Sequence, residues 1–191
     1  MAVNQIISNF ITVASQKDFA RDNLFRVMAF KTRILALDET ELIYCKGARV
    51  PGRETPTAQV NYHGMKMNYN KSTVDYTGSD SYELEFYLDA KGDLRKKFEE
   101  ASRIIFNDVS NTGNWRFPST SDVITIAQLG FDMNPIKYFH LYGVTLKSID
   151  VLDGKPADGD GQAMTCKVTL SYLYYRTEGS DTIYSEEATT N

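Results

Sequence analysis

The chain has 191 residues, of which 42% are apolar, and its formal charge of −4 corresponds to a pI near 5.2. A chain of this length can bury a core of its own as one domain, without a disulfide or a metal ion as a staple. The net negative charge argues against a protein that holds DNA through clustered lysines and arginines, although it suits a surface past which DNA slides.

Residues 1–22 are predicted to form an amino-terminal arm. Ile7, Phe10, Ile11 and Ala14 fall three and four positions apart, a spacing typical of a short helix or an amphipathic arm. The segment lacks the basic and apolar parts of a signal peptide, and the sequence has no run of the about 20 apolar residues that a membrane helix requires. We therefore expect a protein that is made and kept in the cytoplasm, with no membrane anchor.

The first half of the chain reads as β-structure, in keeping with its 12 Tyr and 10 Phe. Asn23 to Phe30 and Glu41 to Lys46 are predicted strands, with a hairpin turn over residues 37–40. Gly and Pro punctuate residues 47–64, which are therefore expected to form a long loop or an irregular sheet edge. Tyr62 to Tyr76 again has the composition of a strand.

Ser81 to Asp89 is the clearest strand in the sequence. Its apolar residues alternate with polar ones, which predicts one buried face and one face exposed to water or to a partner. Glu83 and Glu85 fall together on the polar face. Two carboxylates can be read as a glycosidase pair, but a hydrophilic wall is the simpler interpretation of two residues on one face of a strand.

One helix is predicted over about residues 92–107, with Asp93 as its N-cap. Its apolar face should cover one end or one face of the β-structure and shield the core from water. That face is formed by Leu94, Phe98, Ala101, Ile104 and Ile105, opposite Lys96, Lys97, Glu99 and Glu100. Residues 107–120 are expected to form a second long loop.

The last third of the chain returns to strands. They are predicted over Val123 to Leu129, Tyr138 to Val151 and Gln162 to Tyr175, and the last of these alternates well between apolar and polar residues. A polar loop rich in Asp and Gly, residues 153–161, joins the final two strands. Residues 177–191 are polar, and we expect a mobile tail there.

The residues that could carry chemistry do not converge in the sequence. His63 and His140 have neither HxxxH nor HExxH spacing, so each is interpreted as a packed or interfacial side chain. Cys45 and Cys166 have no neighbouring His and are interpreted as buried free thiols. The segment 158–161 could hold a weakly bound cation, but a solvated loop is the simpler interpretation. We expect no catalytic residue, cofactor site or metal site, and hence not an enzyme.

Two segments carry a resemblance to a known family. Asp18 to Val27 (DFARDNLFRV) joins a polar, helix-like leader directly to an apolar strand, and Cys45 to Gly52 (CKGARVPG) follows the second predicted strand. Together they resemble the tail tube proteins of contractile-tailed bacteriophages. The resemblance extends over most of residues 5–176, because the arm, strands, loop, flanking helix and closing aromatic strand occur in the order of that family.

The resemblance implies a mainly β fold with one flanking α-helix, in which two sheets form a β-barrel or sandwich of the tail tube type. The barrel domain would span residues 23–176, between the arm and the tail. The implied function is that of an inner tail tube subunit, whose hexameric rings stack into a conduit for DNA and tape-measure protein. Its partners would be further copies of itself, the sheath, the baseplate, the tape-measure protein and double-stranded DNA that passes non-specifically. Its location would be the virion tail, assembled in the host cytoplasm.

The order and polarity of the segments also give expected surfaces. The residues expected at contacts between rings are Phe10, Asp18, Phe19, Arg21, Asp22, Arg49, Arg53, Glu54 and Tyr62, and those expected to face the lumen are Glu83 and Glu85. Asp18 and Asp22 can equally be read as local caps at a helix-to-strand turn. Alternative functions are a tube-initiating baseplate protein, a tube subunit of a secretion or injection machine, or a monomeric β-barrel that binds a small apolar ligand among its Tyr and Phe residues.

Overall fold

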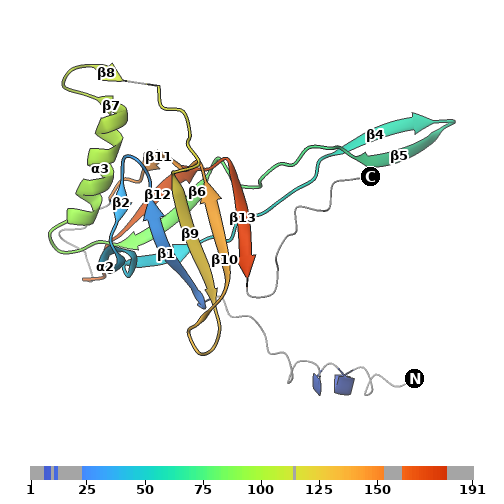
Figure 1. Cartoon of the computed structure of the whole chain (residues 1–191), viewed down its shortest axis with the longest axis horizontal. Helices are drawn as coiled ribbons and strands as arrows, with labels where there is room; N and C mark the ends of the chain where they lie inside the picture. Colours follow the sequence, from blue (N-terminus) through green and yellow to red (C-terminus); the bar gives the residue numbers. More distant parts are fainter. Residues whose placement is uncertain (1–6, 10, 13–22, 114, 153–160, 180–191) are drawn as a thin grey trace.

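Two antiparallel sheets enclose the core of the protein (Figure 1). The computed structural model describes residues 7–9, 11–12, 23–113, 115–152 and 161–179. The first sheet contains β1 (Phe25–Lys31), β2 (Ala36–Leu37), β9 (Val123–Leu129), β10 (Pro135–Tyr142) and β13 (Tyr174–Gly179), in the order β13-β10-β9-β1-β2. The second contains β3 (Cys45–Ala48), β6 (Tyr82–Tyr87), β11 (Thr145–Ile149) and β12 (Thr165–Ser171), in the order β11-β12-β6-β3. The predicted mainly β, two-sheet fold is confirmed.

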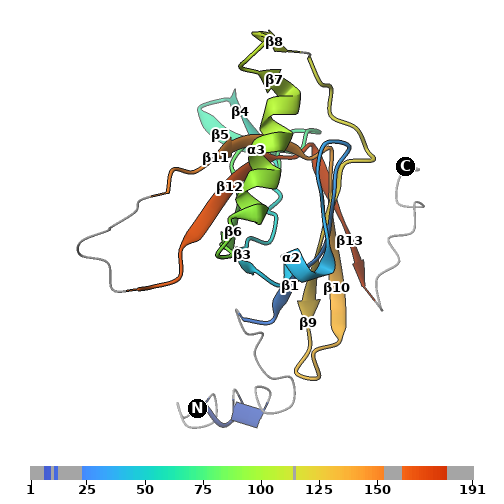
Figure 2. The same ribbon diagram turned by 90° about the vertical axis from the view of Figure 1, so that its left-hand side faces the viewer.

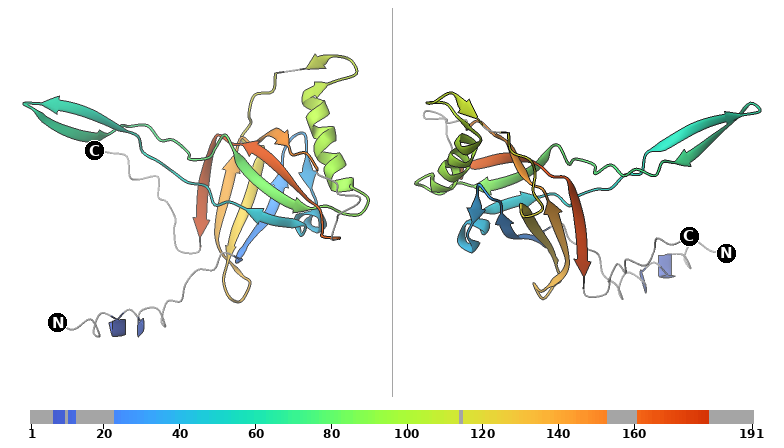
Figure 3. Two further views of the ribbon diagram at one scale, coloured as in Figure 1. Left: turned by 180° about the vertical axis from the view of Figure 1, so that it is seen from behind. Right: turned by 45° about the horizontal axis from the view of Figure 1, so that its top comes forward.

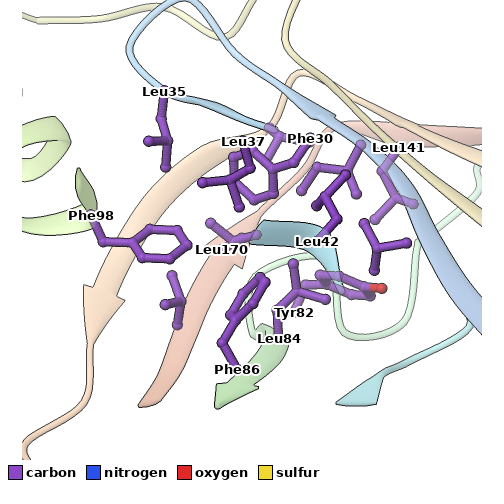
Figure 4. Packing of buried hydrophobic residues seen from close by; sticks show 14 of the residues in the cluster. Phe30, Leu35, Leu37, Leu42, Tyr82, Leu84, Phe86, Phe98, Leu141 and Leu170 are labelled. Carbon is purple, nitrogen blue, oxygen red and sulfur yellow. The ribbon is translucent and has the colours of Figure 1, made fainter. Parts of the chain in front are cut away.

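The core lies between the sheets and is filled by large side chains from both of them (Figure 4). In β6, Leu84 and Phe86 are fully buried while Glu83 and Glu85 are not, so the alternation predicted for Ser81 to Asp89 is confirmed. Leu141 of β10 belongs to the same buried cluster and comes from the other sheet. Because each sheet is apolar on its inner face, burying both faces together is what drives the sheets to pack.

The helix α3 (Asp93–Ile105) closes one open side between the sheets (Figure 2). The ring of Phe98 contacts that of Phe30 in the first sheet, with centroids 6.1 Å apart, and that of Phe86 in the second, at 5.5 Å. The prediction that Asp93 is the N-cap is wrong, because Gly92 holds that position with a φ of 71°. The capping carboxylate comes from Asp89, which accepts the backbone N–H groups of Asp93 and Leu94.

The strands predicted over Tyr138 to Val151 and Gln162 to Tyr175 are each broken in two. The chain bends at Gly143, between β10 and β11, and again at Leu173, between β12 and β13. Since β10 pairs with β13 and β11 pairs with β12, these strands form one long hairpin that folds at its middle and contributes one half to each sheet. An unbroken apolar pattern runs through both bends because the residues on either side of each bend are buried in the same core.

The strand predicted over Glu41 to Lys46 is also wrong in part. A short helix, α2 (Glu39–Leu42), begins where the hairpin turn was expected, and β3 starts only at Cys45. The backbone N–H of Asp38 donates to the Glu41 carboxylate over 2.9 Å, which is half of a capping box. The Asp-x-x-Glu spacing is the local signal that favours a helix start over a strand.

Residues 47–64 are not simply a loop. Thr57–Tyr62 forms β4, which pairs with β5 (Met65–Asn70) as a separate two-stranded sheet. In the segment expected to be a loop over 107–120, the short strands β7 (Phe106–Asn107) and β8 (Thr112–Gly113) pair beyond the end of α3. Strand β13 continues to Gly179, so the first residues assigned to the tail are part of the sheet.

None of the helices in the described part of the chain has the length and apolar character needed to cross a lipid bilayer.

Candidate assembly surfaces

The hairpin formed by β4 and β5, called here the projecting hairpin, has one apolar and one polar face. Successive side chains of a strand point to opposite faces, so the pairing register assigns each residue to a face. The apolar face consists of the pairs Ala58 and Tyr69, Val60 and Met67, and Tyr62 and Met65. The polar face consists of Thr57 and Asn70, Gln59 and Asn68, and Asn61 and Lys66. The hairpin is therefore amphipathic along its whole length.

The apolar face of this hairpin is exposed. Val60, Tyr62, Met65 and Tyr69 are exposed by 49%, 62%, 65% and 52%. In both views of Figure 3 the hairpin extends away from the two large sheets. An isolated two-stranded hairpin is marginally stable in water, so this exposed apolar face is a candidate interaction surface.

The tip of the projecting hairpin is a tight turn at His63 and Gly64. Both residues have positive φ, 47° and 80°, which is the geometry of a type I′ turn between twisted strands. The His63 ring lies against the Tyr62 ring at 4.3 Å between centroids, so His63 acts here as a packed side chain at an exposed tip.

The base of the hairpin continues as paired backbone toward the barrel. Glu54 and Asp75 exchange two backbone hydrogen bonds of 2.8 and 2.9 Å, and the Lys71 N–H donates to the Pro56 carbonyl over 2.8 Å. The predicted contact residues Arg53 and Glu54 are exposed at this base. These bonds fix the direction in which the hairpin leaves the barrel.

The outer face of β6 carries a pair of ion pairs with β3 and the segment that follows it. Lys46 Nζ lies 3.0 Å from Glu85, and Arg49 lies 2.9 Å from Glu83. The hydrogen bond from Lys46 lowers the pKa of Glu85 below its ordinary value, and the same bond raises the pKa of Lys46. The two glutamates share one polar face, as predicted, and their charges are balanced within the chain. The lumen-facing role assigned to them stays a prediction.

Of the nine residues predicted from sequence to make ring contacts, the four that the structure describes lie at three places. Tyr62 lies on the apolar face of the projecting hairpin, Arg53 and Glu54 lie at its base, and Arg49 lies on the outer face of the four-stranded sheet. The remaining five, Phe10, Asp18, Phe19, Arg21 and Asp22, lie outside the described residues. Sequence reasoning missed most of the apolar face, although alternation from Ala58 to Tyr62 and from Met65 to Tyr69 around His63-Gly64 was a readable signal.

The described histidine and cysteine side chains away from the hairpin form no cluster suited to chemistry. Among the described residues, no three His, Cys, Asp or Glu side chains gather where they could hold a metal ion. His140 Nδ1 lies 3.0 Å from the Thr125 hydroxyl, and its Nε2 lies 3.4 Å from the Glu178 carboxylate. Burial raises the pKa of the Cys45 thiol to about 11, so this thiol stays protonated near neutral pH and is a poor nucleophile. The loop 153–160 lies outside the described residues.

Comparison of the sequence finds no match to a protein-family model or to a curated protein sequence. Comparison of the fold does find similar structures. A chain in the baseplate of the anti-feeding prophage (AFP) matches with a TM-score of 0.60 and 16% identity, over 87% of this chain and 99% of that chain. A chain in the AFP tube-terminating cap matches with a TM-score of 0.53 and 6% identity, over 86% of this chain and 93% of that chain.

A third match comes from the sheath-tube complex of PVC, an extracellular contractile injection system, in its extended state. Its TM-score is 0.51 at 8% identity, over 88% of this chain and 97% of that chain. At identities this low, the likeness establishes the fold. The resemblance read from sequence is confirmed at the level of a tube-related fold, and its assignment to a phage tail stays a prediction. The protein has the mainly β fold found in tube, terminator and baseplate structures of contractile injection systems.

Proposed function

We propose that this protein is a structural subunit of the inner tube of a contractile tail or injection machine, in which copies assemble into hexameric rings that stack within a sheath. The observation that carries the proposal is the uncovered apolar face of the projecting hairpin, on a fold shared with components of such machines. Tube subunits work by polymerising, and this face is a surface that a neighbouring copy would cover.

The energetics favour a partner for this face. Val60, Tyr62, Met65 and Tyr69 each retain between about half and two thirds of their accessible surface. Covering each of them stabilises an assembly by on the order of 1 kcal/mol, from the free energy of removing apolar surface from water. Each copy in a ring would present this face, so the total stabilisation of the assembly would grow with the number of copies. A surface repeated by symmetry is suited to assembly with identical subunits.

The edges of the four-stranded sheet offer a second contact. Strand β3 forms one edge and β11 the other, and in the described part of the chain neither has a further strand paired to its outer side. Pairing of β3 in one copy with β11 in the next would join the sheets into a continuous barrel. The polar face with Glu83 and Glu85 would then line the lumen. Because the ion pairs to Lys46 and Arg49 balance these carboxylates, passing DNA would meet few free charges.

The proposed partners follow from this position. The chain would contact further copies of itself, the sheath and the baseplate, while tape-measure protein and double-stranded DNA would occupy the lumen without specific binding. The arm, residues 1–22, would contact an adjacent ring. The location would be the tail of a virion or of a phage-like injection particle, assembled in the host cytoplasm.

A second candidate is a protein that initiates the tube at the baseplate. The specific observation in its favour is the match to a chain in the AFP baseplate, over 99% of that chain. A monomeric ligand-binding barrel is less well supported, because large side chains fill the interior between the sheets (Figure 4). Phe86 and Phe98 are exposed by 0% and 1% and occupy the space that a ligand would need.

Negative-stain electron microscopy of the purified protein over a range of concentrations tests the proposal. Long tubes are the expected result for a main tube subunit, and single rings would favour the tube initiator. A monodisperse monomer at high concentration would overturn both assembly functions and would revive the ligand-binding alternative.

A further inference from the structure

Two clusters of exposed apolar side chains lie at opposite ends of the five-stranded sheet. The helix-end cluster lies in the last turn of α3, in the β7–β8 hairpin and in the segment that follows it, and consists of Ile104, Phe106, Val109, Trp115 and Phe117. The second, called here the β9–β10 tip, consists of Phe131, Met133 and Ile136 in and beside the turn that joins these strands. In Figure 2 the helix end is at the top of the molecule, and the β9–β10 turn is at the bottom.

Strand β9 runs from one cluster to the other. Asp122 immediately precedes β9 and lies beside the helix-end cluster, whereas Gly130 immediately follows β9 and begins the tip. The full length of the strand therefore lies between them. A surface at one end of a subunit can meet the surface at the other end only in a different copy, through a head-to-tail contact.

The β9–β10 tip is a fixed turn that holds an apolar side chain outward. The Asp132 carboxylate accepts hydrogen bonds from the Asn134 N–H at 3.1 Å and from its side-chain amide at 2.6 Å, and the Met133 N–H donates to the Gly130 carbonyl at 3.0 Å. Met133 has a φ of 62°, a left-handed conformation that is costly for a residue with a side chain. Met133 is also 63% exposed, so contacts within its own chain do little to offset the strain of this backbone conformation.

The helix-end cluster borders a hollow of about 250 Å³ in the end of the barrel. Apolar side chains, among them Ile34, Ile105, Phe117 and Leu146, line it. Its shape is held by Arg33, which bonds both the Asp122 carboxylate, at 3.0 Å, and the Phe117 carbonyl, at 2.7 Å. The hollow is therefore built by a fixed loop, and it is large enough to receive one or two side chains.

The two ends offer charges that can pair. Arg116 lines the hollow beside the ion pair of Arg33 and Asp122, and Arg103 lines a neighbouring depression together with Glu100. The β9–β10 tip carries Asp132, whose pKa is held below its ordinary value by the side-chain and backbone hydrogen bonds from Asn134. Asp132 is therefore ionised at neutral pH, and it would approach Arg116 at the rim of the apolar hollow when two copies are placed end to end.

We propose that the β9–β10 tip of one copy inserts into the hollow beside the helix-end cluster of the next copy, with Met133 packed against Phe117. This inference rests on the proposed function, because it requires rings that stack head to tail. The occupant is a second copy of this chain, since the two surfaces lie at opposite ends of one subunit and match in polarity and charge. A contact between different surfaces does not close on itself, so it repeats along the tube axis.

A pair of introduced cysteines tests the contact directly. In the full chain, Met133→Cys combined with Phe117→Cys is oxidised after tube assembly and analysed on a non-reducing gel. The expected result is a ladder of dimers, trimers and longer species. Each single variant should give no ladder, because the contact does not place Met133 beside Met133 or Phe117 beside Phe117. Oxidised wild-type protein controls for Cys45 and Cys166.

The outcomes separate this inference from the proposed function. Tubes of the double variant that show no ladder, or single variants that cross-link as strongly as the double variant, would overturn the contact and leave the tube function intact. Wild-type protein that forms neither rings nor tubes would overturn the tube function and with it the contact.

A second variant separates the contact from folding. Met133→Asn removes the apolar side chain but suits the left-handed backbone, because Asn adopts that conformation more readily than Met. The monomer should melt no lower than wild type, while the protein concentration at which tubes first sediment should rise at least tenfold. Met164→Asn makes the same change at an exposed Met in neither cluster, and it should leave tube formation unchanged. Tube formation by Met133→Asn at the wild-type concentration would overturn the proposal.

Discussion

Gly143 and Leu173 meet where the long hairpin bends from one sheet into the other. A Cβ atom on Gly143 would lie 2.7 Å from both Cγ and Cδ1 of Leu173, and Gly143 has a φ of 69°. The Leu173 N–H donates to the Tyr142 carbonyl over 2.9 Å, which ties the two bends together. Only glycine combines this backbone conformation with so close an approach.

We therefore expect Gly143→Ala to lower the free energy of unfolding by about 2–4 kcal/mol, from the positive φ and the clash together. Leu173→Ala should cost less, because Leu173 is 50% exposed. The double variant should be more stable than the sum of the single changes predicts, since shortening Leu173 removes the two nearest atoms. Denaturant unfolding of the four proteins measures this coupling, and strict additivity would show that the close approach is not the cause.

Asp122 is the one buried charged residue in the described core, and its pairing with Arg33 gives a pH dependence. Burial alone would raise the pKa of the Asp122 carboxyl, but hydrogen bonds from the Arg33 side chain and backbone outweigh it and hold that pKa below its ordinary value. Because the pKa of Asp122 is lower in the folded than in the unfolded protein, its ionised form stabilises the fold at pH values above the unfolded-state pKa of about 4. This stabilisation is lost as the pH falls through the folded-state pKa.

Asp122→Asn should therefore be less stable than wild type at pH 6, by about 1–3 kcal/mol for a buried charge-assisted pair. The difference should shrink as the pH falls from about 4 toward 2, because the wild-type carboxyl becomes protonated there. Urea unfolding of both proteins across this range measures it. A difference that stays constant with pH would contradict the ionised pair.

The two faces of the projecting hairpin can be compared by substituting the same residue, threonine, on each of them. Tyr62→Thr with Tyr69→Thr removes apolar surface while keeping a residue that favours strands. We expect the barrel to melt within a few degrees of wild type, and ring formation to require at least tenfold more protein. Gln59→Thr with Asn68→Thr places the same residues on the polar face. This control should assemble as wild type does, and equal effects of the two variants in analytical ultracentrifugation would show that the apolar face has no special role.

The amino-terminal arm is tested by removal of residues 1–16. The prediction rests on the apolar spacing of Ile7, Phe10, Ile11 and Ala14 and on the resemblance to tail tube proteins. The shortened chain should remain folded by circular dichroism and should fail to polymerise. Tubes of normal length from the shortened chain would reject the role of the arm in ring-to-ring contact.

The elements predicted correctly from the sequence are those whose apolar pattern depends on one buried face of a single helix or strand. Alternation in Ser81 to Asp89 and the helical spacing from Leu94 to Ala101 each record a single buried face, so β6 and α3 were found. The bends at Gly143 and Leu173 were missed because both halves of each strand bury apolar residues in one core, and periodicity does not record which sheet a strand joins. The Gly at position 143 was the one local sign of a bend.

The projecting hairpin was missed for a different physical reason. Pro51 and Pro56 dominated the prediction for residues 47–64, yet they precede β4 and remove no donor from its ladder with β5. The identity of the partner that covers the apolar face is a property of the assembly, so no pattern within one chain records it. What the sequence did contain was the alternation on both sides of His63 and Gly64.

The projecting hairpin is tested most directly by cryo-electron microscopy of an assembled particle or of tubes grown from the purified protein. We expect the apolar face with Val60, Tyr62, Met65 and Tyr69 to be seated on a neighbouring copy, in rings stacked head to tail. A reconstruction in which this face remains in solvent, or a protein that stays monomeric at every concentration, would contradict the proposal that this chain works by assembling.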